Sequence, residues 1–321
     1  MSAKAFVSRL VVQPARNLRW RAYECRFVRL LDSRTLEDSA TPRHFLKGAS
    51  DQYLLWLFSH GYGPRYNLNG LIPTMPGDDV QRHWTGHTGE STLREALHFF
   101  QIVCGVARTH SRSFGEDAQV LDYGCGWGRV IRFFLRDVDH VGLYGCDCYP
   151  EAVETARNHN RWCTFEVVRP VPPTEFQSNK FDLIYLYFVF SHLSEDLHLR
   201  LLEEFHRILK PDGILVATTR ARHFILDCEK LRHQSSIPVQ ERGSSASFVD
   251  TAAFLQRYDQ GLFCHSPTGG GGVLEPSFYG ETCIPCRYVE RAWTQWFDLL
   301  EYRYADRKCP QNTICCRKRG C

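Results

Sequence analysis

The stretch VLDYGCGWGR, residues 120–129, decides the fold, because it joins a short apolar strand to the next segment through a turn of glycines. Glycine adopts positive φ readily and lets the main chain approach a ligand where any Cβ would clash. The turn contains Gly124, Gly126 and Gly128. The segment after it, GRVIRFFLRDV at 128–138, is predicted to be a helix.

The glycine turn favours a cationic ligand group over a phosphate. A dinucleotide site has the spacing GxGxxG, whereas Arg129 stands here where the third glycine would be. Asp122 precedes the turn, and its carboxylate would repel a pyrophosphate at a helix N-terminus. The same carboxylate suits a nucleotide-like ligand that carries ammonium and sulfonium groups. A nicotinamide-dependent oxidoreductase stays open as an alternative with the same fold class.

A second acid follows in GLYGCDCYPEAVETARNH, which begins at Gly142 and predicts a strand and then a helix. The strand ends at Asp147, about 20 residues after the glycine turn, where an acid can bond both hydroxyls of a ribose. A lone Asp at a strand end can also be a helix cap, and this alternative applies to Asp147.

The later segments continue the alternation of strands and helices. Strands are predicted from Cys163 and from Phe181. The segment SEDLHLRLLEEFHRILKPDGILVATTR, 194–220, predicts a helix opened by Ser194, a Pro-Gly turn and a fifth strand. Residues 293–319 predict two strands joined by a polar turn.

With these motifs in this order, residues 84–318 resemble the class I S-adenosylmethionine-dependent methyltransferases of the small-molecule type. The resemblance implies an α/β fold with a doubly wound, mostly parallel seven-stranded sheet of order 3-2-1-4-5-7-6, strand 7 antiparallel, and helices on both faces. It implies S-adenosylmethionine as the cofactor, above the carboxyl ends of strands 1 and 2. The residues expected to contact it are Asp122, Tyr123, Gly124, Cys125, Gly126, Gly128, Asp147, Cys148 and Tyr149.

The segment after the third strand departs from the family pattern. Many relatives carry an Asp there that binds the adenine amino group, whereas this chain reads VVRPVPPTEFQ. Adenine is therefore expected to be held by backbone and apolar groups from about Val168 to Val171.

We expect three parts along the chain: an N-terminal arm or cap at 1–83, a methyltransferase domain at 84–321, and within it an acceptor-binding insertion at 221–290, between strands 5 and 6. The four glycines at 269–272 predict a mobile loop, which is either a passive linker or a functional lid. In the family a helix before the first strand leans over the cofactor. The residues that lead into it are expected to line the pocket: Trp84, Thr85, Gly86 and His87. A plain helix N-cap by Thr88 is the alternative explanation of the same pattern.

Methyl transfer to a hydroxyl requires a base on the acceptor side, beyond the fourth strand. His192 is the leading candidate, and His265 is the next; a purely structural role for His192 is the competing interpretation. Tyr279 and Glu281 are expected to bind the substrate. The predicted reaction is O-methylation of a small hydroxylated metabolite or sugar. N-methylation and a non-catalytic S-adenosylmethionine-binding protein stay open.

Composition limits the partners. The formal net charge of +3 is too small to indicate nucleic acid, and no run of 18 apolar residues suggests a membrane span. A cytoplasmic location is expected, although the basic start at 1–23 has the composition of either a surface arm or an organelle transit peptide.

The fourteen cysteines are predicted to be reduced thiols, without disulfides and without a metal site. Three of them fall in or beside predicted core strands and are interpreted as small buried hydrophobes: Cys125, Cys146 and Cys163. A zinc site would need Cys315 and Cys316 on one side, but adjacent residues of a strand point to opposite faces.

Overall fold

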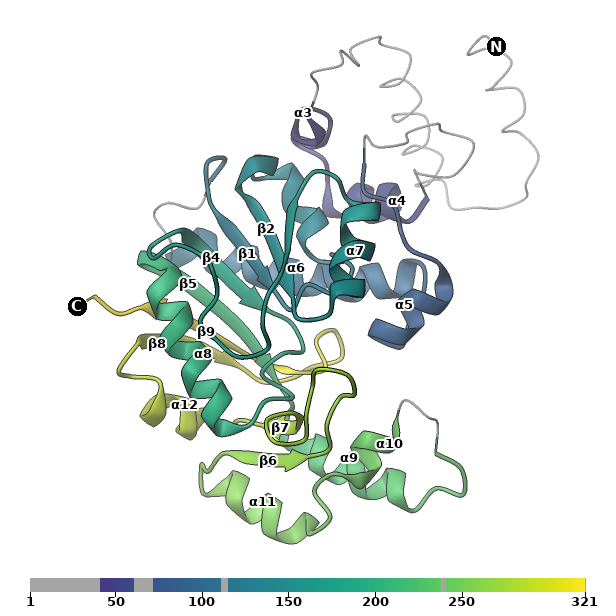
Figure 1. Cartoon of the computed structure of the whole chain (residues 1–321), viewed down its shortest axis with the longest axis vertical. Coiled ribbons are helices and arrows are strands. Elements are labelled where there is room, and N and C mark those ends of the chain that lie inside the picture. Colours follow the sequence, from purple (N-terminus) through teal and green to yellow (C-terminus); the bar gives the residue numbers. More distant parts are fainter. Residues whose placement is uncertain (1–40, 61–71, 111–114, 238–240, 321) are drawn as a thin grey trace.

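The computed structural model describes residues 41–60, 72–110, 115–237 and 241–320, and a seven-stranded sheet runs through its middle (Figure 1). The strand order is β3-β2-β1-β4-β5-β9-β8. Strands β1 to β5 pair in parallel, and β9 is antiparallel to both β5 and β8. This order and the antiparallel β9 confirm the predicted fold class. The strands are β1 Val120–Tyr123, β2 Leu143–Asp147, β3 Thr164–Val167, β4 Phe181–Leu186, β5 Leu209–Thr219, β8 Phe297–Arg303 and β9 Asn312–Lys318.

Helices cover both faces of the sheet, so the central strands are buried on both sides. All residues of β1 and β4 are buried, and their nearly continuous apolar sequences are typical of parallel strands between two helical layers. The larger elements of one layer are α4 Asp51–His60, α6 Glu90–His110, the 3₁₀ helix η1 Ile131–Arg136 and α7 Pro150–His159. The other layer is formed by α8 Glu195–Ile208 and α12 Cys286–Ala292.

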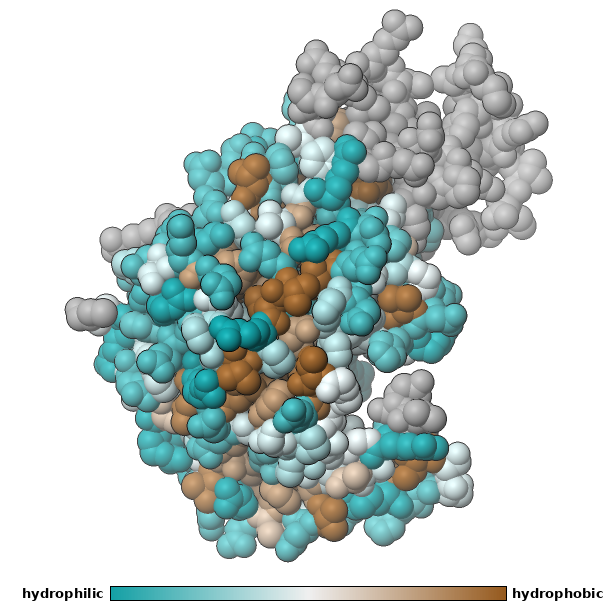
Figure 2. All heavy atoms as spheres, viewed as in Figure 1, coloured by the Kyte–Doolittle hydropathy of each residue, from teal (hydrophilic) through white to brown (hydrophobic). Residues whose placement is uncertain are grey.

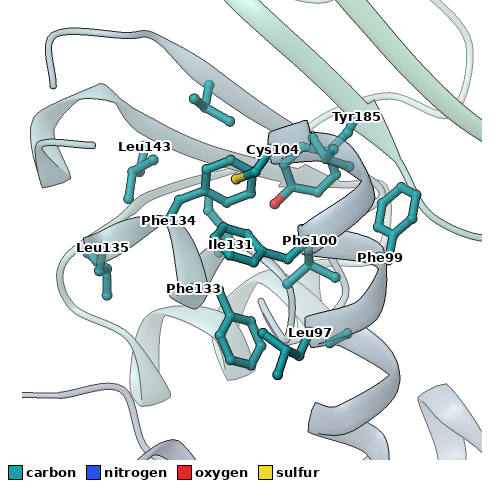
Figure 3. Close-up of a cluster of buried hydrophobic side chains, with 14 of the residues drawn as sticks. Leu97, Phe99, Phe100, Cys104, Ile131, Phe133, Phe134, Leu135, Leu143 and Tyr185 are labelled. Carbon is teal, nitrogen blue, oxygen red and sulfur yellow. The ribbon is translucent and has the colours of Figure 1, made fainter. Parts of the chain in front are cut away.

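The layer that contains α6 has an aromatic core, and Figure 3 shows its side chains converging between α6 and η1. Phe100 lies edge-on to Phe134, with ring centroids 4.8 Å apart, and Phe134 stacks on Tyr185 at 5.3 Å. Aromatic pairs of this kind add about 0.5–1.5 kcal/mol beyond the area that they bury. The helix η1, which directly follows the glycine turn, is therefore closely packed against α6.

Helix α8 begins where its sequence predicts. The Ser194 hydroxyl accepts a hydrogen bond from Leu197 N, which satisfies one of the free N–H groups of the first turn. Leu197, Leu201 and Phe205 recur at the helical interval and are buried against the sheet.

Two segments differ from the sequence prediction. The segment after the glycine turn is the 3₁₀ helix η1 rather than an α-helix, with i→i+3 bonds such as Phe133 N to Val130 O. Its side chains are buried against α6, and this packing outweighs the local helix propensity. Helix α4 falls within the expected arm, where the sequence does not predict it: its run from Tyr53 to Phe58 is buried throughout and packs on α6.

The insertion forms its own small lobe below the sheet in Figure 1. It contains helices α9 Arg222–Arg232, α10 Arg242–Ala246 and α11 Thr251–Asp259, and a two-stranded sheet of β6 Cys264–Pro267 and β7 Gly280–Cys283. Isolated bridges join this lobe to the main sheet, at Leu193 with Tyr279 and at Arg220 with Cys283. The loop after β4 and the end of β5 therefore lie beside β7. The short elements left are α3 Pro42–Leu46, α5 Asp78–Thr85 and η2 His140–Gly142.

The glycine run 269–272, for which the sequence predicts a mobile loop, forms a turn at the end of the β6–β7 hairpin, and its mobility stays a prediction. Gly269, Gly271 and Gly272 have positive φ, and Gly270 N donates to Leu274 O at 2.8 Å. Positive φ is the conformation for which glycine is suited, so the turn explains the use of glycine at these positions.

The described cysteines behave as predicted where the structure bears on them. Cys125, Cys146 and Cys163 are buried. Cys315 packs in the core on one face of the sheet and Cys316 in the core on the other. Within the described ranges no cluster of potential metal ligands is found, and no helix is long and apolar enough to cross a membrane. The basic segment 1–23 lies outside those ranges.

Candidate active site

A cleft of about 1550 Å³ opens at the carboxyl ends of the central strands. Its floor is the glycine turn after β1, and its walls come from α5, from the ends of β2, β4 and β5, and from the insertion. Figure 2 shows hydrophobic side chains gathered in the middle of the face that Figure 1 presents, between α7 and the insertion. Ligands of open α/β sheets bind at this end of the strands, so the cleft is the candidate active site.

The glycine turn is held against β2 by main-chain bonds. Gly124 N donates to Cys146 O at 2.8 Å, and Gly124 has a φ of 75°. A Cβ at Gly124 would lie 2.4 Å from Val189 Cγ2, so this position excludes any side chain. At Gly126, φ is 53° and a Cβ would have nothing within 4 Å, which leaves bare main chain at the cleft.

Asp147 lies on the cleft wall at the end of β2. Its Oδ2 accepts from Gly126 N at 2.9 Å and its Oδ1 accepts from Tyr149 N at 3.0 Å. Burial raises the pKa of Asp147, while the bonds from the main chain oppose that rise. Each oxygen retains a further lone pair, so this carboxylate can still accept bonds from two hydroxyls.

Asp122 lies apart from the cleft. It is buried on the α6 side of the sheet, beside Tyr185, and is not part of the cleft wall. Its Oδ2 has no hydrogen-bond partner among the described residues, and burial raises the pKa of its carboxyl to about 7. The two acids expected at the cofactor therefore have different surroundings, and a direct contact of Asp122 with a ligand stays a prediction.

A cation that the sequence did not assign stands on the wall next to the turn. Arg129 lines the cleft, and both of its terminal nitrogens donate to Glu95 Oε1 at 3.2 Å. The same oxygen accepts from the Tyr187 hydroxyl at 2.8 Å, and the guanidinium lies 5.0 Å from the Tyr187 ring centroid. Arg129, which replaces the third glycine of the dinucleotide fingerprint, thus places a positive charge on the cleft wall, and Glu95 fixes its position.

Tyr149 joins the cofactor side of the cleft to the glycine run. Its hydroxyl donates to Gly271 O at 2.7 Å, and its ring meets Trp84 edge-on at 5.5 Å. The expected adenine segment contributes Val168 and Pro170 to the wall. The turn at 269–272 therefore lies across this end of the cleft.

His192 also lines the cleft, from the loop after β4. Its Nδ1 is 2.9 Å from Gly280 O, and since a carbonyl can only accept, Nδ1 carries the proton. In the neutral ring Nε2 is then the unprotonated nitrogen. The Tyr279 ring stacks on the imidazole, with centroids 5.0 Å apart and planes 6° apart. Burial lowers the pKa of His192, which favours the neutral form.

Glu281 on β7 lies behind this histidine and is almost fully buried. Its Oε2 accepts from Arg220 Nε at 2.9 Å and lies 3.6 Å from His192 Nδ1, and its Oε1 accepts from the Ser244 hydroxyl at 2.9 Å. Burial by itself would raise the pKa of Glu281, but the charge of Arg220 and the hydrogen bonds from Arg220 and Ser244 oppose it, and the net shift is downward. Glu281 is therefore an ionised carboxylate that accepts hydrogen bonds from Arg220 and Ser244.

His265, the second predicted base, is not on the cleft wall. Its Nδ1 lies 2.8 Å from the Thr282 hydroxyl, which itself donates to Leu193 O at 2.7 Å. Because that hydroxyl proton is used, His265 Nδ1 is the donor. Burial lowers the pKa of His265 to about 4, so the ring is neutral.

The structure brings most of the predicted site residues to one cleft. The predicted residues that line it are Trp84, Thr85, Gly86, Tyr123, Gly124, Cys125, Gly126, Asp147, Cys148, Tyr149, His192, Tyr279 and Glu281. The predicted residues that do not line it are His87, Asp122, Gly128 and His265. Lining side chains that the sequence did not single out include Arg129, Tyr187, Phe188, Arg220 and Phe224. Of these residues, only Arg129 is marked in the sequence, because it stands where a dinucleotide site has its third glycine.

Comparison with known families identifies the segment that contains the glycine turn. The model of a methyltransferase domain family matches residues 120–213, which include the glycine turn, Asp147 and the loop of His192. The chain carries a class I S-adenosylmethionine-dependent methyltransferase domain. The cofactor of this methyltransferase is accordingly S-adenosylmethionine. No curated protein matches the chain.

Solved structures similar to this methyltransferase include an S-adenosylmethionine-dependent methyltransferase from Methanosarcina mazei, with 18% identity over 66% of this chain and 96% of that chain and a TM-score of 0.42. A second comes from Mesorhizobium loti, with 15% identity, 67% and 96% coverage and a TM-score of 0.44. A third, from Haloferax volcanii, is a complex of the Trm112 methyltransferase activator with a methyltransferase, with 14% identity, 77% and 100% coverage and a TM-score of 0.45.

Proposed function

We propose that this methyltransferase methylates a hydroxyl group of a small hydroxylated metabolite or sugar, with His192 as the general base. The single observation that carries the proposal is the 2.9 Å contact of His192 Nδ1 with Gly280 O. It leaves Nε2 as the free base of a ring on the cleft wall. The proton of the acceptor hydroxyl would pass to this atom as the oxygen becomes methylated.

The cofactor half of the cleft fits S-adenosylmethionine, which supplies an electrophilic methyl group when bound. Asp147 would accept bonds from the ribose hydroxyls, because each of its oxygens has a lone pair beyond those bonded to Gly126 N and Tyr149 N. Bare main chain at Gly126 would admit the ligand closely. The expected contacts of Asp122, Tyr123, Gly124, Cys125, Gly128, Cys148 and Tyr149 belong to the same proposal.

Arg129 would hold the carboxylate of the methionine part. It is a positive side chain on the wall next to the glycine turn, and its present bonds to Glu95 are long for a charged pair, at 3.2 Å. The apolar residues Val168 and Pro170 would lie against the adenine. These assignments leave the His192 side of the cleft for the acceptor.

The acceptor side combines aromatic surface with polar groups. Phe188, Phe224 and Tyr279 line it, and Ser244 and Gln234 from the insertion add polar side chains. A sugar or another small hydroxylated molecule presents apolar faces and hydroxyls, so it matches such a wall. In this proposal the insertion 221–290 binds the acceptor, 84–321 is the catalytic domain and 1–83 precedes it.

The test is incubation of the full chain with S-adenosylmethionine labelled in the methyl group and a fractionated small-molecule extract. We expect label in a hydroxylated small molecule, as an ether that resists mild acid and base. Label on nitrogen would contradict O-methylation. Binding of S-adenosylhomocysteine without transfer to any fraction would indicate the non-catalytic alternative.

A further inference from the structure

We propose that Arg220 and Glu281 act as a positioning pair for His192, in which the carboxylate stabilises the protonated ring and the guanidinium limits that effect. The inference rests on the proposed role of His192 as the base. Neither residue needs to touch the acceptor for this role. It reassigns Glu281, which the sequence predicts to bind the substrate, to a position behind the base.

The bonds of Glu281 support this reassignment. Its side chain is 8% exposed, and both of its oxygens have partners, in Arg220 and in Ser244. Arg220 also donates from Nη2 to Oε1 at 3.4 Å, so this carboxylate accepts three bonds and has less capacity for substrate hydroxyls than Asp147, which accepts two. Its Oε2 nevertheless lies 3.6 Å from His192 Nδ1, close enough for a strong charge interaction where water is largely excluded.

Arg220 is held in place independently of Glu281. Its main-chain N donates to Thr282 O at 3.3 Å, which ties the end of β5 to β7. Its guanidinium lies 4.2 Å from the Phe224 ring centroid and 5.6 Å from that of Phe188. The pair therefore spans from the main sheet to the insertion, with His192 beside it. A fixed charge pair needs no reorganisation when a proton arrives.

The two charges act on the base in opposite directions. Burial, the largest influence, lowers the pKa of His192; Glu281 raises this pKa and Arg220 lowers it. Burial keeps the titratable groups next to this cluster neutral: it lowers the pKa of His265 to about 4, raises that of Cys228 to about 12, and raises those of Tyr279 and Cys283 above their ordinary range. The charged side chains Asp227, Lys230 and Glu241 line the same cleft. The opposing charges of Arg220 and Glu281 are thus the part of the surroundings that can be changed by substitution to shift the pKa of His192.

The test follows the ring protons of His192 by NMR titration of the full chain saturated with S-adenosylhomocysteine, with the resonance assigned by its absence in His192→Gln. We expect Glu281→Gln to lower the pKa of His192, because the stabilising charge is lost. We expect Arg220→Gln to raise it, because Glu281 is then uncompensated. The double variant removes both charges, and its pKa should return toward the wild-type value. Glu203→Gln, an exposed change on α8, is the matched control and should leave it unchanged.

Opposite shifts in the two single variants support the positioning pair, since general loosening of the fold would move both pKa values in the same direction. Shifts of the same sign, or none, would overturn it. If either single variant fails to fold, the pKa of His192 is measured in the double variant and in Arg220→Lys instead. Arg220→Lys retains the positive charge, so the pKa of His192 should stay near the wild-type value. Absence of S-adenosylhomocysteine binding by the wild-type chain would instead count against the proposed function.

Discussion

The two halves of the cleft that we propose for the cofactor and for the acceptor are built by different means. The cofactor half consists mainly of main chain from the glycine turn and one carboxylate, Asp147, held by two backbone N–H groups. The acceptor half consists of side chains, His192, Arg220 and Glu281, from three separate segments. The first arrangement follows from local sequence, whereas the second exists only once the insertion is seated on the sheet. Substitutions in the two halves should therefore affect different measurements.

The largest effect is expected from the base. His192→Gln removes the free Nε2 but conserves a polar side chain, so methyl transfer to the labelled acceptor should fall by about 10²–10⁴-fold. Binding of S-adenosylhomocysteine, measured by calorimetry, should stay within about threefold, because the residue lies in the other half. Unchanged transfer by this variant would remove His192 from the mechanism. The matched control is His233→Gln, which lies just after α9.

Asp147→Asn should give the reverse pattern. Loss of the charge and of one acceptor at the ribose position should weaken S-adenosylhomocysteine binding by about 10–100-fold. Asp298→Asn, an exposed acid on β8 paired with Arg319, makes the same change in net charge and should bind normally. If Asp147→Asn and the wild type bound S-adenosylhomocysteine with equal affinity, Asp147 would not be part of the cofactor site.

Asp122 allows a pH test of the acid that lies off the cleft wall. Burial raises the pKa of its carboxyl from the ordinary value of 3.8 to about 7, so its contribution to stability is present below pH 4 and is lost as pH rises through about 7. Asp122→Asn cannot ionise, so relative to the wild type it should gain stability between about pH 5 and pH 8, at about 1.4 kcal/mol per pKa unit at most. The difference in the free energy of unfolding between the two proteins is measured by urea unfolding at about pH 5 and about pH 8. A pH-independent difference between the two proteins would contradict the raised pKa.

Gly124→Ala tests the main-chain geometry of the cofactor half. The new Cβ would meet Val189 Cγ2 at 2.4 Å on a backbone with a φ of 75°, so the free energy of unfolding should fall by about 1–3 kcal/mol. Adding Val189→Ala should restore part of the loss. Gly105→Ala, in the interior of α6 with open space at the Cβ position, should stabilise by about 0.5–1 kcal/mol.

The smallest effect concerns the contact that joins the two halves. Tyr149→Phe removes the hydroxyl that donates to Gly271 O, a bond with a net contribution of about 0.5–1.5 kcal/mol. Amide hydrogen exchange at 269–279 should become faster, whereas exchange in β1 and β4 should not change. Tyr304→Phe, an exposed site at the end of β8, is the matched control. Unchanged exchange in the glycine run would mean that its order comes from its own turn bonds alone.

The sheet order follows from the family resemblance, and that resemblance is carried by short motifs that can be recognised in the sequence. The glycine turn and the Ser194 cap are visible as short patterns, and the acid Asp147 follows the turn at a regular spacing in the next strand. The sequence does not reveal Arg220 or the Glu95 partner of Arg129, because their roles depend on side chains more than 30 residues away, at Glu281 in the case of Arg220. It places His265 in the site because a histidine in the insertion looks equivalent to His192 until the direction of each side chain is known. The 3₁₀ form of η1 escapes prediction for a related reason, since packing on α6 decides it.

The most direct test is a calorimetric titration of the full chain with S-adenosylhomocysteine, with NADH titrated in parallel. The division of the cleft described above predicts one S-adenosylhomocysteine site per chain, weakened by Asp147→Asn and unaffected by His192→Gln, and no heat with NADH. Tight binding of NADH, or no binding of S-adenosylhomocysteine by the folded wild-type chain, would contradict it.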